Sequence, residues 1–209
     1  MLKLLSGHRD LGIHTELLAD GFVDLVEQGV VTGTRKTDHV NKIVTTSAMG
    51  SARLYRFVDE NPGVEVLAGR PHQRPAQHQS PGGHGGDQRT LEVDFLGQCA
   101  SESLGSQYWS STGGQEDFGR GAIHSSGGQS FIVLHSTTAD GSVSRIVPQL
   151  HPGAAVTTFK NVVDRVVTEH GVAELRGRSI RERARRLIDI AAPDHREGLE
   201  HEARRIGYL

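Results

Sequence analysis

Four consecutive apolar residues, Phe131-Ile132-Val133-Leu134, place the strongest constraint on how this 209-residue chain can fold. A strand that is apolar on both faces must be covered on both faces, which is typical of a parallel sheet flanked by helices. Other strand-like runs alternate with helically spaced apolar residues: strands at 11–15, 43–46 and 64–67, helices at about 17–28 and 50–61. This alternation predicts an α/β fold with an open, mostly parallel sheet and flanking helices.

The second half of the chain continues the alternation. Strands are predicted at 91–95, 143–147, 154–158 and 162–168. Glycine-rich loops are predicted around Gly105 and Gly113-Gly114. Two helices follow: the first has a capping box, N-cap Ser179 with Glu182 three residues later, and the second begins near Pro193.

The composition excludes several classes of function. The formal charge is -2, and acidic and basic residues are interspersed along the chain. The sequence therefore predicts no basic surface of the kind that binds nucleic acid. No apolar run approaches the roughly 20 residues of a membrane-spanning helix. Cys99 is the single cysteine, so no internal disulfide can form and a reducing, cytoplasmic compartment is expected. The chain has 12 histidines but no His-Glu-x-x-His motif, and no metal site is predicted.

One short apolar run stops on a carboxylate: Leu11-Gly12-Ile13-His14-Thr15-Glu16. A helical pattern follows at once, so Glu16 is expected at the end of a strand, directly before a helix begins. Ligands of open α/β sheets bind at the edge where the strands end. Glu16 is therefore a candidate nucleophile.

Six groups of residues, in order along the chain, resemble one known family. They are Leu11-Gly12-Ile13-His14-Thr15-Glu16 with Asp20-Gly21; Leu91-Glu92-Val93-Asp94 with Gly97-Gln98; Gly113-Gly114-Gln115 with Asp117-Phe118 and Arg120-Gly121-Ala122; Ser144-Arg145-Ile146-Val147-Pro148; Val167-Thr168-Glu169-His170-Gly171-Val172-Ala173; and Leu175-Arg176-Gly177 with Arg181-Glu182-Arg183-Ala184. Together they resemble the carboxyl-terminal domain of the acetyl-CoA hydrolase/CoA-transferase family, which includes 4-hydroxybutyrate CoA-transferases. The resemblance implies one CoA-transferase-like α/β domain over residues 1–209.

The resemblance also implies a reaction: CoA moves between an acyl-CoA and a small carboxylate. A glutamate attacks the thioester to form a mixed anhydride, and the released CoA thiolate converts this into a glutamyl-CoA thioester. A carboxylate acceptor reverses the steps, or water ends them as hydrolysis. A carboxylate nucleophile divides one difficult step into easier ones, and each acyl transfer passes through an oxyanion that needs N–H donors. CoA would be a substrate, with no tightly bound cofactor. The expected partners are an acyl-CoA and a small carboxylate, together with a second copy of the chain or a separate amino-terminal half.

Three positions match the site of that family. Glu16 matches the nucleophile. Gly113-Gly114, followed by Gln115, suits an oxyanion and CoA-binding loop, because glycine lets the backbone approach a ligand closely. Glu169 matches a second family glutamate near the acyl and carboxylate site.

Each position also has a structural interpretation. A glutamate at a strand end is usually solvated, and a Gly-Gly pair is often a turn. Glu169 could instead form an ion pair with Arg145 or Arg176. Cys99 is expected to be a small buried residue, with a Cys-dependent hydrolase as the alternative.

Two features depart from the family. Its members carry a whole amino-terminal domain, and a Gly-x-Gly-x-Ile-Pro loop just before the position of Met1; without them, half of the active-site cleft is expected to be missing unless another chain supplies it. Residues 70–89 have almost no apolar content, do not match the family, and taken literally predict an irregular loop.

Back-translation indicates a shifted reading frame in residues 70–89. With suitable synonymous codons, His72-Gln73-Arg74-Pro75 is CAC CAA CGA CCC, which one base later reads Thr-Asn-Asp-Pro. Residues 84–90 can be encoded as CAT GGT GGC GAT CAA CGG ACG, and the frame that starts one base later reads Met-Val-Ala-Ile-Asn-Gly. The family has an Asn-Asp-Pro motif and an apolar strand resembling Met-Val-Ala-Ile-Asn at these places. We therefore hypothesise two compensating insertions or deletions, near residues 68–71 and 89–90.

The replaced strand is expected to weaken the fold. Each lost buried apolar side chain is worth roughly 1.5–3 kcal/mol, against a domain stability of roughly 5–15 kcal/mol. The chain as written is thus predicted to fold loosely. Besides CoA transfer, the sequence leaves open acetyl-CoA hydrolysis and a non-catalytic truncated remnant.

Overall fold

The computed structural model describes residues 2–67 and 85–209. The chain divides into two compact units, within residues 1–81 and 82–209, and each unit has its own sheet and apolar core. The family resemblance implied one domain over residues 1–209, whereas the division falls within the polar stretch 70–89.

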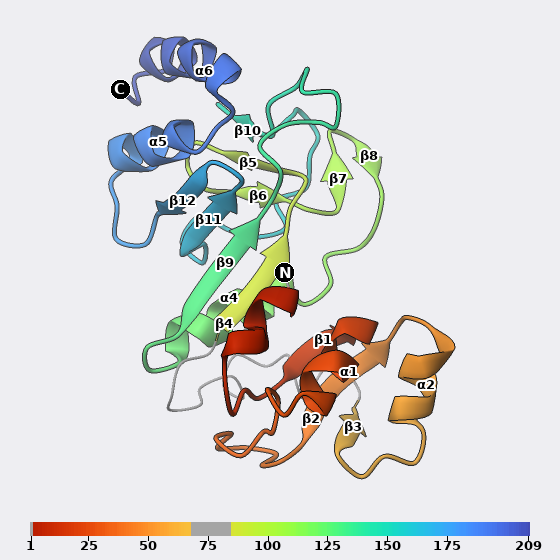
Figure 1. Ribbon diagram of the computed structural model, residues 1–209. Helices are drawn as coiled ribbons and strands as arrows, with labels where there is room; N and C mark the ends of the chain where they lie inside the picture. The colour runs from red at the N-terminus through yellow and green to blue at the C-terminus, as the bar shows by residue number, and fades with distance from the viewer. Residues whose placement is uncertain (1, 68–84) are drawn as a thin grey trace. The chain divides into compact units, whose positions relative to one another are not determined.

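The first unit is a parallel sheet whose strands are linked by helices (Figure 1). After a short 3-10 helix η1 (Leu2–Gly7), the order is β1 (His14–Leu18), α1 (Asp20–Glu27), β2 (Ile43–Ala48), α2 (Ala52–Val58) and β3 (Val64–Val66). The sheet order is β1-β2-β3 and both pairings are parallel. Each helix therefore connects two parallel neighbours, which confirms the predicted strand–helix alternation.

The prediction that Glu16 ends its strand is wrong. β1 continues through Leu18, and Leu17 pairs with Ser47, so Glu16 lies inside the paired region. Leu18 is fully buried, and this anchor in the core explains why the strand runs past the carboxylate. The helix begins only at Asp20.

Asp20 joins the starts of the two helices of this unit. Its carboxylate accepts hydrogen bonds from the backbone N of Ser51 at 2.9 Å and from Ser51 Oγ at 2.6 Å. These bonds lower the pKa of Asp20. Gly50 permits the approach, because a Cβ at that position would overlap the Asp20 carboxylate.

The second unit is built around a four-stranded sheet in the order β12-β11-β9-β4. β4 (Gly85–Arg89), β9 (Gln129–Val133) and β11 (Arg165–Thr168) are parallel, and β12 (Gly171–Glu174) returns antiparallel beside β11. Smaller sheets contain β5 (Glu92–Asp94), β6 (Cys99–Ala100) and β10 (Ile146–Val147), and the hairpin β7 (Ser103–Leu104) with β8 (Gln107–Tyr108). The helices are α4 (Gln115–His124), α5 (Ile180–Asp189) and α6 (Pro193–Arg205). This mixed α/β architecture with mostly parallel sheets confirms the predicted fold class.

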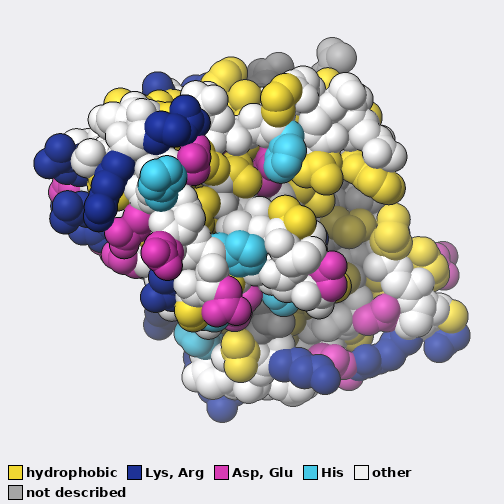
Figure 2. Space-filling view, turned by 90° about the horizontal axis from the view of Figure 1, so that it is seen from above, with side chains coloured by type: hydrophobic (Ala, Val, Ile, Leu, Met, Phe, Trp, Pro, Cys, Tyr) yellow, Lys and Arg dark blue, Asp and Glu magenta, His cyan; other side chains and the backbone are white. Residues whose placement is uncertain are grey.

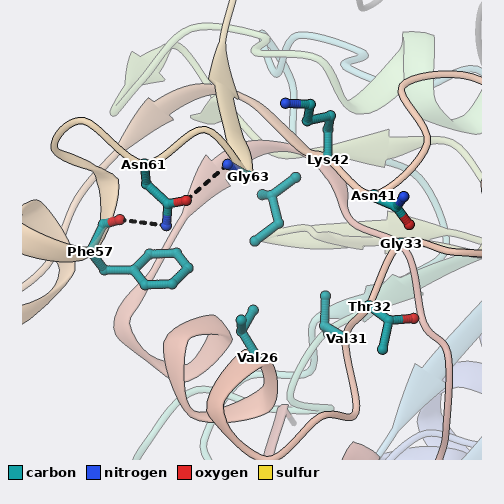
Figure 3. Close-up of a pocket in the computed structure, with 10 residues that line it drawn as sticks. Val26, Val31, Thr32, Gly33, Asn41, Lys42, Phe57, Asn61 and Gly63 are labelled. Carbon is teal, nitrogen blue, oxygen red and sulfur yellow. Dashed lines mark hydrogen bonds between the residues drawn. The ribbon is translucent and has the colours of Figure 1, made fainter.

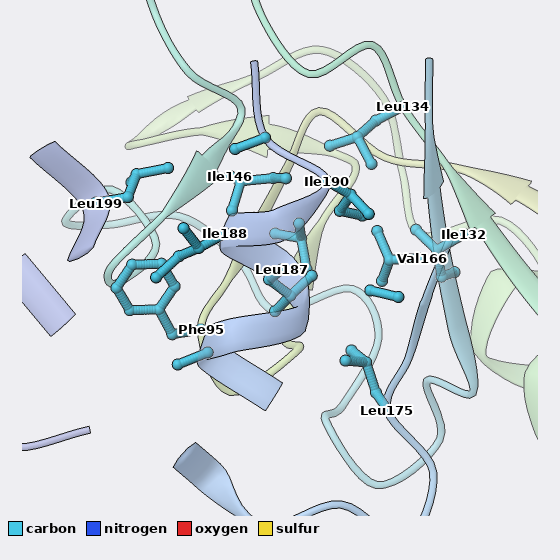
Figure 4. Packing of buried hydrophobic residues seen from close by; sticks show 14 of the residues in the cluster. Phe95, Ile132, Leu134, Ile146, Val166, Leu175, Leu187, Ile188, Ile190 and Leu199 are labelled. Atoms are coloured by element: carbon cyan, nitrogen blue, oxygen red, sulfur yellow. The ribbon is translucent and has the colours of Figure 1, made fainter. Parts of the chain in front are cut away.

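Helix α5 supplies the centre of the core in the second unit (Figure 4). The predicted capping box of Ser179 and Glu182 is confirmed at its start. Leu187 and Ile188 pack with apolar side chains from the strands and loops, among them Phe95, Ile132, Leu134, Ile146, Val166 and Leu175. Figure 2 shows basic side chains gathered on the side of the second unit where α5 and α6 lie. The arginines of these two helices are Arg181, Arg183, Arg185, Arg186, Arg196, Arg204 and Arg205.

Three predicted segments differ from the structure. Residues 154–158 are not a strand, since Thr158 forms only an isolated bridge with Cys99. The strand predicted at 143–147 is limited to Ile146–Val147. Residues 85–89, expected to be irregular, form β4 and pair in register with β9. The remainder of that stretch, residues 70–84, lies outside the described residues.

Candidate functional site

The backbone of Glu16 is held by hydroxyl groups of the neighbouring strand. Its carbonyl oxygen accepts hydrogen bonds from Thr46 Oγ1 at 2.7 Å and Ser47 Oγ at 3.0 Å. The Thr45 hydroxyl lies 3.3 Å from the same oxygen but donates its proton to Ser47 O at 2.7 Å. A carbonyl oxygen has two lone pairs, so these two donors fill its capacity. The parallel β1–β2 pairing brings these hydroxyls together. The half-buried glutamate is thereby fixed at its backbone, whatever its side chain contacts.

Gly113, Gly114 and Gln115 lie together at the start of α4. Gly113 has φ +56°, the left-handed region that favours glycine. Gly114 is the N-cap residue, and its carbonyl accepts the Phe118 N–H at 3.0 Å. The sequence predicted a loop at these glycines but not the helix that follows. A helix start presents backbone N–H groups, so this loop can donate hydrogen bonds to an anion.

Gln115 adds a buried amide to this loop. The residue is only 4% exposed, and within residues 2–67 and 85–209 its Nε2 has no hydrogen-bond partner. A buried amide N–H without a partner is costly. The neighbouring acid Glu116 is engaged elsewhere: Arg120 Nη2 lies 2.6 Å from Oε1, and the Phe159 N–H donates to Oε2 at 3.3 Å.

Glu169 directly follows β11 and binds Ser136, which lies just beyond β9. Its carboxylate accepts hydrogen bonds from the Ser136 hydroxyl at 2.6 Å and from the Ser136 backbone N at 3.0 Å. Arg176, proposed above as an ion-pair partner, instead lies 3.3 Å from Asp164. The prediction of an ion pair between Glu169 and Arg176 is therefore wrong. Glu169 is instead hydrogen-bonded to Ser136.

These hydrogen bonds determine the charge of Glu169. Partial burial acts to raise the pKa of this carboxyl group. The bonds from Ser136 and from the backbone outweigh burial and lower the pKa to about 2. Glu169 is therefore a carboxylate at neutral pH.

Two acids of the Leu91–Asp94 motif have structural contacts. Asp94 accepts hydrogen bonds from Leu96 N, Gln98 N and Gln98 Nε2 at 2.7–3.0 Å. Burial raises the pKa of Asp94. Glu92 is 1% exposed and binds both the backbone N of His151 at 3.0 Å and its Nδ1 at 2.5 Å. Nothing in the sequence indicated the Glu92–His151 pair, because 59 residues separate the partners.

Cys99 is fully buried, as predicted. Burial raises the pKa of its thiol far above the usual range, which disfavours the thiolate that a nucleophile needs. This geometry argues against the Cys-dependent hydrolase. Within the described part of the chain, no group of three or more His, Cys, Asp or Glu side chains is arranged to hold a metal ion. Likewise, none of its helices combines the length and apolar content needed to cross a membrane.

A small pocket of about 110 Å³ lies in the first unit (Figure 3). It lies where β2 and β3 begin. The Asn61 side chain in its wall donates from Nδ2 to Phe57 O at 2.8 Å and accepts from Gly63 N at Oδ1, also at 2.8 Å. Its lining residues are Val26, Val31, Thr32, Gly33, Asn41, Lys42, Ile43, Phe57, Asn61 and Gly63. None of the candidate residues lines this pocket.

Known proteins resemble the chain over almost all of its length. Residues 50–203 match the family described as acetyl-CoA hydrolase/transferase C-terminal domain. The chain is 52% identical to a succinyl-CoA:cyclohexane-1-carboxylate CoA transferase of Geobacter metallireducens, over 99% of this chain and 47% of that protein. It is 46% identical to a 4-hydroxybutyrate coenzyme A transferase of Clostridium kluyveri, over 97% of this chain and 47% of that protein.

A solved structure shares the fold. The crystal structure of RipA from Yersinia pestis superposes with a TM-score of 0.93 at 38% identity, and the match covers 100% of this chain and 47% of that one. The chain thus spans about half the length of the relatives that it matches. The family match and the identities agree with the motifs of the sequence, and on this evidence the chain belongs to the acetyl-CoA hydrolase/transferase family.

Proposed function

We propose that this chain carries the nucleophile of a CoA-transferase that moves CoA between an acyl-CoA and a small carboxylate. The main support for the proposal is the fixed backbone of Glu16, whose carbonyl oxygen accepts hydrogen bonds from the hydroxyls of Thr46 and Ser47. A fixed backbone leaves only the side-chain torsions to be ordered before the Glu16 carboxylate can attack. Family membership supplies the class of reaction.

The proposed reaction begins when a carboxylate oxygen of Glu16 attacks the thioester carbonyl carbon. The resulting oxyanion collapses, the C–S bond breaks, and CoA leaves as a thiolate, which yields an acyl–glutamyl anhydride. The thiolate then attacks the glutamyl carbonyl carbon and expels the acyl group as a carboxylate. An acceptor carboxylate attacks the glutamyl-CoA thioester in turn, and the same steps in reverse release a new acyl-CoA and free Glu16.

The second unit supplies the remaining proposed roles. The loop Gly113-Gly114, with Gln115, donates hydrogen bonds to an oxyanion or to CoA; its support is the helix start and the unpartnered, buried Gln115 amide among the described residues. Glu169 takes part in the acyl and carboxylate site; its support is the Ser136 hydrogen bonds that hold it ionised. No cofactor other than the substrate CoA is proposed.

The domain assignment is likewise proposed: residues 1–209 act as one functional carboxyl-terminal region, although they fold as two units. A second copy of the chain or a separate amino-terminal half is the proposed protein partner. Water in place of the acceptor carboxylate would give acetyl-CoA hydrolysis, the other activity in the family description. The choice depends on how well the site excludes water.

The test is a product assay with the 209-residue chain, combined with a separately produced amino-terminal half from a relative, with acetyl-CoA and with butyrate as acceptor. The proposal predicts butyryl-CoA formation that is lost in Glu16→Gln and kept in Glu27→Gln, a control from the end of α1. Free CoA without butyryl-CoA would indicate hydrolysis instead. Turnover that persists in Glu16→Gln contradicts the assignment, and no turnover in the unaltered chain favours the non-catalytic remnant.

A further inference from the structure

The small pocket of the first unit lies apart from the candidate nucleophile (Figure 3). Its wall includes Ile43, the first residue of β2, and Gly63, which directly precedes β3. The hydroxyls that hold Glu16 belong to Thr46 and Ser47, further along β2. A strand rises about 3.3 Å per residue, so roughly 10 Å of strand separates Ile43 from Thr46. The pocket is therefore a separate feature, at the edge where the parallel strands begin.

Apolar side chains from four segments form the interior of the pocket. Val26 comes from α1, Val31 from the loop after α1, Ile43 from β2 and Phe57 from α2. Val31 and Ile43 are buried, whereas Val26 and Phe57 are half-buried and pack against the same apolar core. Figure 3 shows Val26, Val31 and Phe57 around one space. Such an interior favours the hydrocarbon part of a ligand.

The volume of the pocket limits the size of that hydrocarbon part. An apolar cavity of about 150 Å³ accommodates benzene, with its six carbon atoms. The pocket measures about 110 Å³. By proportion it accommodates roughly four carbon atoms. A longer chain or a fused ring would extend out of the pocket.

The Asn61 side chain supplies a fixed polar group in the wall. Its Nδ2 donates one of two N–H groups to Phe57 O, and its Oδ1 accepts the Gly63 N–H. Within residues 2–67 and 85–209 the second N–H of Nδ2 has no partner, so it is available to a ligand. The wall can therefore donate a hydrogen bond to an acceptor at the pocket.

Lys42 gives the pocket its charge. It is the single charged side chain among the described residues that line the pocket. Its ammonium group donates to Pro62 O, next to the lining Gly63, and two of its three N–H donors remain. The acids nearest in sequence to this wall, Glu60 and Glu65, do not line the pocket, and Glu65 is paired with His39. The charge and the donors at the pocket therefore favour an anion.

We propose that this pocket binds a short aliphatic anion, with an alkyl chain of about four carbon atoms in the apolar interior and the anionic head at Lys42 and Asn61. Burial of the alkyl chain supplies the affinity, and Lys42 selects the charge of the head. The site is independent of the proposed CoA-transferase function, because none of the candidate residues of that function lines it.

The experiment titrates small probes into the 209-residue chain and follows the methyl resonances of Val26, Val31 and Ile43 by nuclear magnetic resonance. Butane-1-sulfonate, 1-butanol and n-butylamine share one alkyl chain but differ in the charge of the head. The sulfonate should bind about fivefold more tightly than the alcohol, and the amine most weakly. Ethanesulfonate, which is shorter by two CH₂ groups, should bind about 15-fold more weakly than butane-1-sulfonate. A sulfonate forms no thioester, so the result is separate from turnover.

Variants assign the two parts of the ligand to their contacts. Lys42→Gln should lower the affinity for butane-1-sulfonate about fivefold, whereas Lys3→Gln, on another lysine of the first unit, should leave it unchanged. Val26→Leu adds a carbon atom to the interior and should weaken binding of every probe. Val66→Leu, on the exposed end of β3, is its control.

The proposal is overturned if butane-1-sulfonate does not bind, or if its resonance changes fall outside the lining residues. Equal affinities for the sulfonate and the alcohol, or an unchanged affinity in Lys42→Gln, overturn it as well. Loss of the proposed transferase activity is scored separately, in the product assay with Glu16→Gln.

Discussion

The hydroxyl group of Thr46 donates a 2.7 Å hydrogen bond to the backbone carbonyl oxygen of Glu16. The bond crosses between two parallel strands, so the position of the candidate nucleophile is set by a neighbour 30 residues away in sequence. The Ser47 hydroxyl donates to the same oxygen at 3.0 Å. The strand β2 therefore acts as the support that holds Glu16.

Replacing Thr46 with valine should slow the reaction of Glu16 while the fold is retained. Valine keeps the β-branched shape but removes the shorter of the two hydroxyl hydrogen bonds that the Glu16 carbonyl oxygen accepts. A neutral hydrogen bond is worth about 1 kcal/mol, so the rate of transfer should fall about fivefold. The rate is measured with saturating acetyl-CoA and butyrate.

Thr15→Val is the control for this experiment. The Thr15 hydroxyl donates to Leu17 O and not to Glu16 O, so the same chemical change is made on the adjacent residue. Thr15→Val should have a clearly smaller effect on the rate than Thr46→Val. Equal losses in both variants would mean that the hydroxyls support the sheet in general and not the nucleophile.

Replacing His151 with alanine should destabilise the second unit. The change removes the 2.5 Å contact of Nδ1 to the Glu92 carboxylate, which is 1% exposed and keeps only the backbone N–H of residue 151. A buried polar group that loses a partner costs about 1–3 kcal/mol. The midpoint of thermal unfolding should fall, whereas His201→Ala on α6 should leave it unchanged. His151→Asn, which can still offer an N–H donor, should recover part of the loss, and a His151→Ala midpoint equal to that of the unaltered chain would contradict this role.

Restoring apolar residues in β4 should stabilise the protein. In the shifted reading frame, Gly85 becomes valine and Asp87 becomes isoleucine, and these positions pair with Gln129 and Phe131 of β9. Glycine and aspartate are poor strand residues, and β-branched residues gain up to about 1 kcal/mol each in a strand. The double variant Gly85→Val/Asp87→Ile should unfold at a higher temperature.

The nucleotide sequence of codons 70–90 provides an independent check. The hypothesis requires that the shifted frame encode Asn-Asp-Pro and Met-Val-Ala-Ile-Asn. If the shifted codons do not encode these motifs, the frameshift hypothesis is wrong. If the double variant Gly85→Val/Asp87→Ile unfolds at a lower temperature, the hypothesis that the present residues weaken β4 is wrong.

The ionisation of Glu169 should make stability fall in acid. Its folded pKa is about 2, below the ordinary value of 4.5, so it contributes stability above pH 4.5 that is lost as the pH falls through about 2. The Glu169 side chain is 42% exposed, which limits the size of the effect through solvent screening. Chemical unfolding between pH 5 and pH 2 should therefore show a shallower decline in Glu169→Gln than in the unaltered chain. Glu197→Gln, on the exposed surface of α6, should keep the original slope; identical slopes in all three proteins would contradict the role of Ser136.

The alternation of apolar patterns was sufficient to predict the fold class and most elements of the first unit. The boundary at Glu16 was not predictable from the local pattern, because Thr15 and Glu16 are polar and only the pairing of Leu17 and Leu18 with β2 extends the strand. The capping box at Ser179 was predicted because its hydrogen bonds are local.

Helix α4 was missed for a physical reason. Its buried face contains glycines where most helices have larger apolar residues, and a Cβ on Gly119 would lie 2.6 Å from the Val162 side chain. Close packing of the helix thus requires glycines, and glycines in a sequence are typical of a loop. The contacts of Glu169 were equally hidden, because Ser136 is 33 residues away and meets it only through the β9–β11 pairing.

The central claim is that Glu16 forms a covalent thioester with CoA. The direct measurement is mass spectrometry of the 209-residue chain after incubation with acetyl-CoA, followed by digestion and mapping of the CoA adduct. We expect one adduct on the peptide that contains Glu16, removed by hydroxylamine and absent from Glu16→Gln. An adduct on another residue, an adduct that persists in Glu16→Gln, or no adduct on the unaltered chain would contradict it.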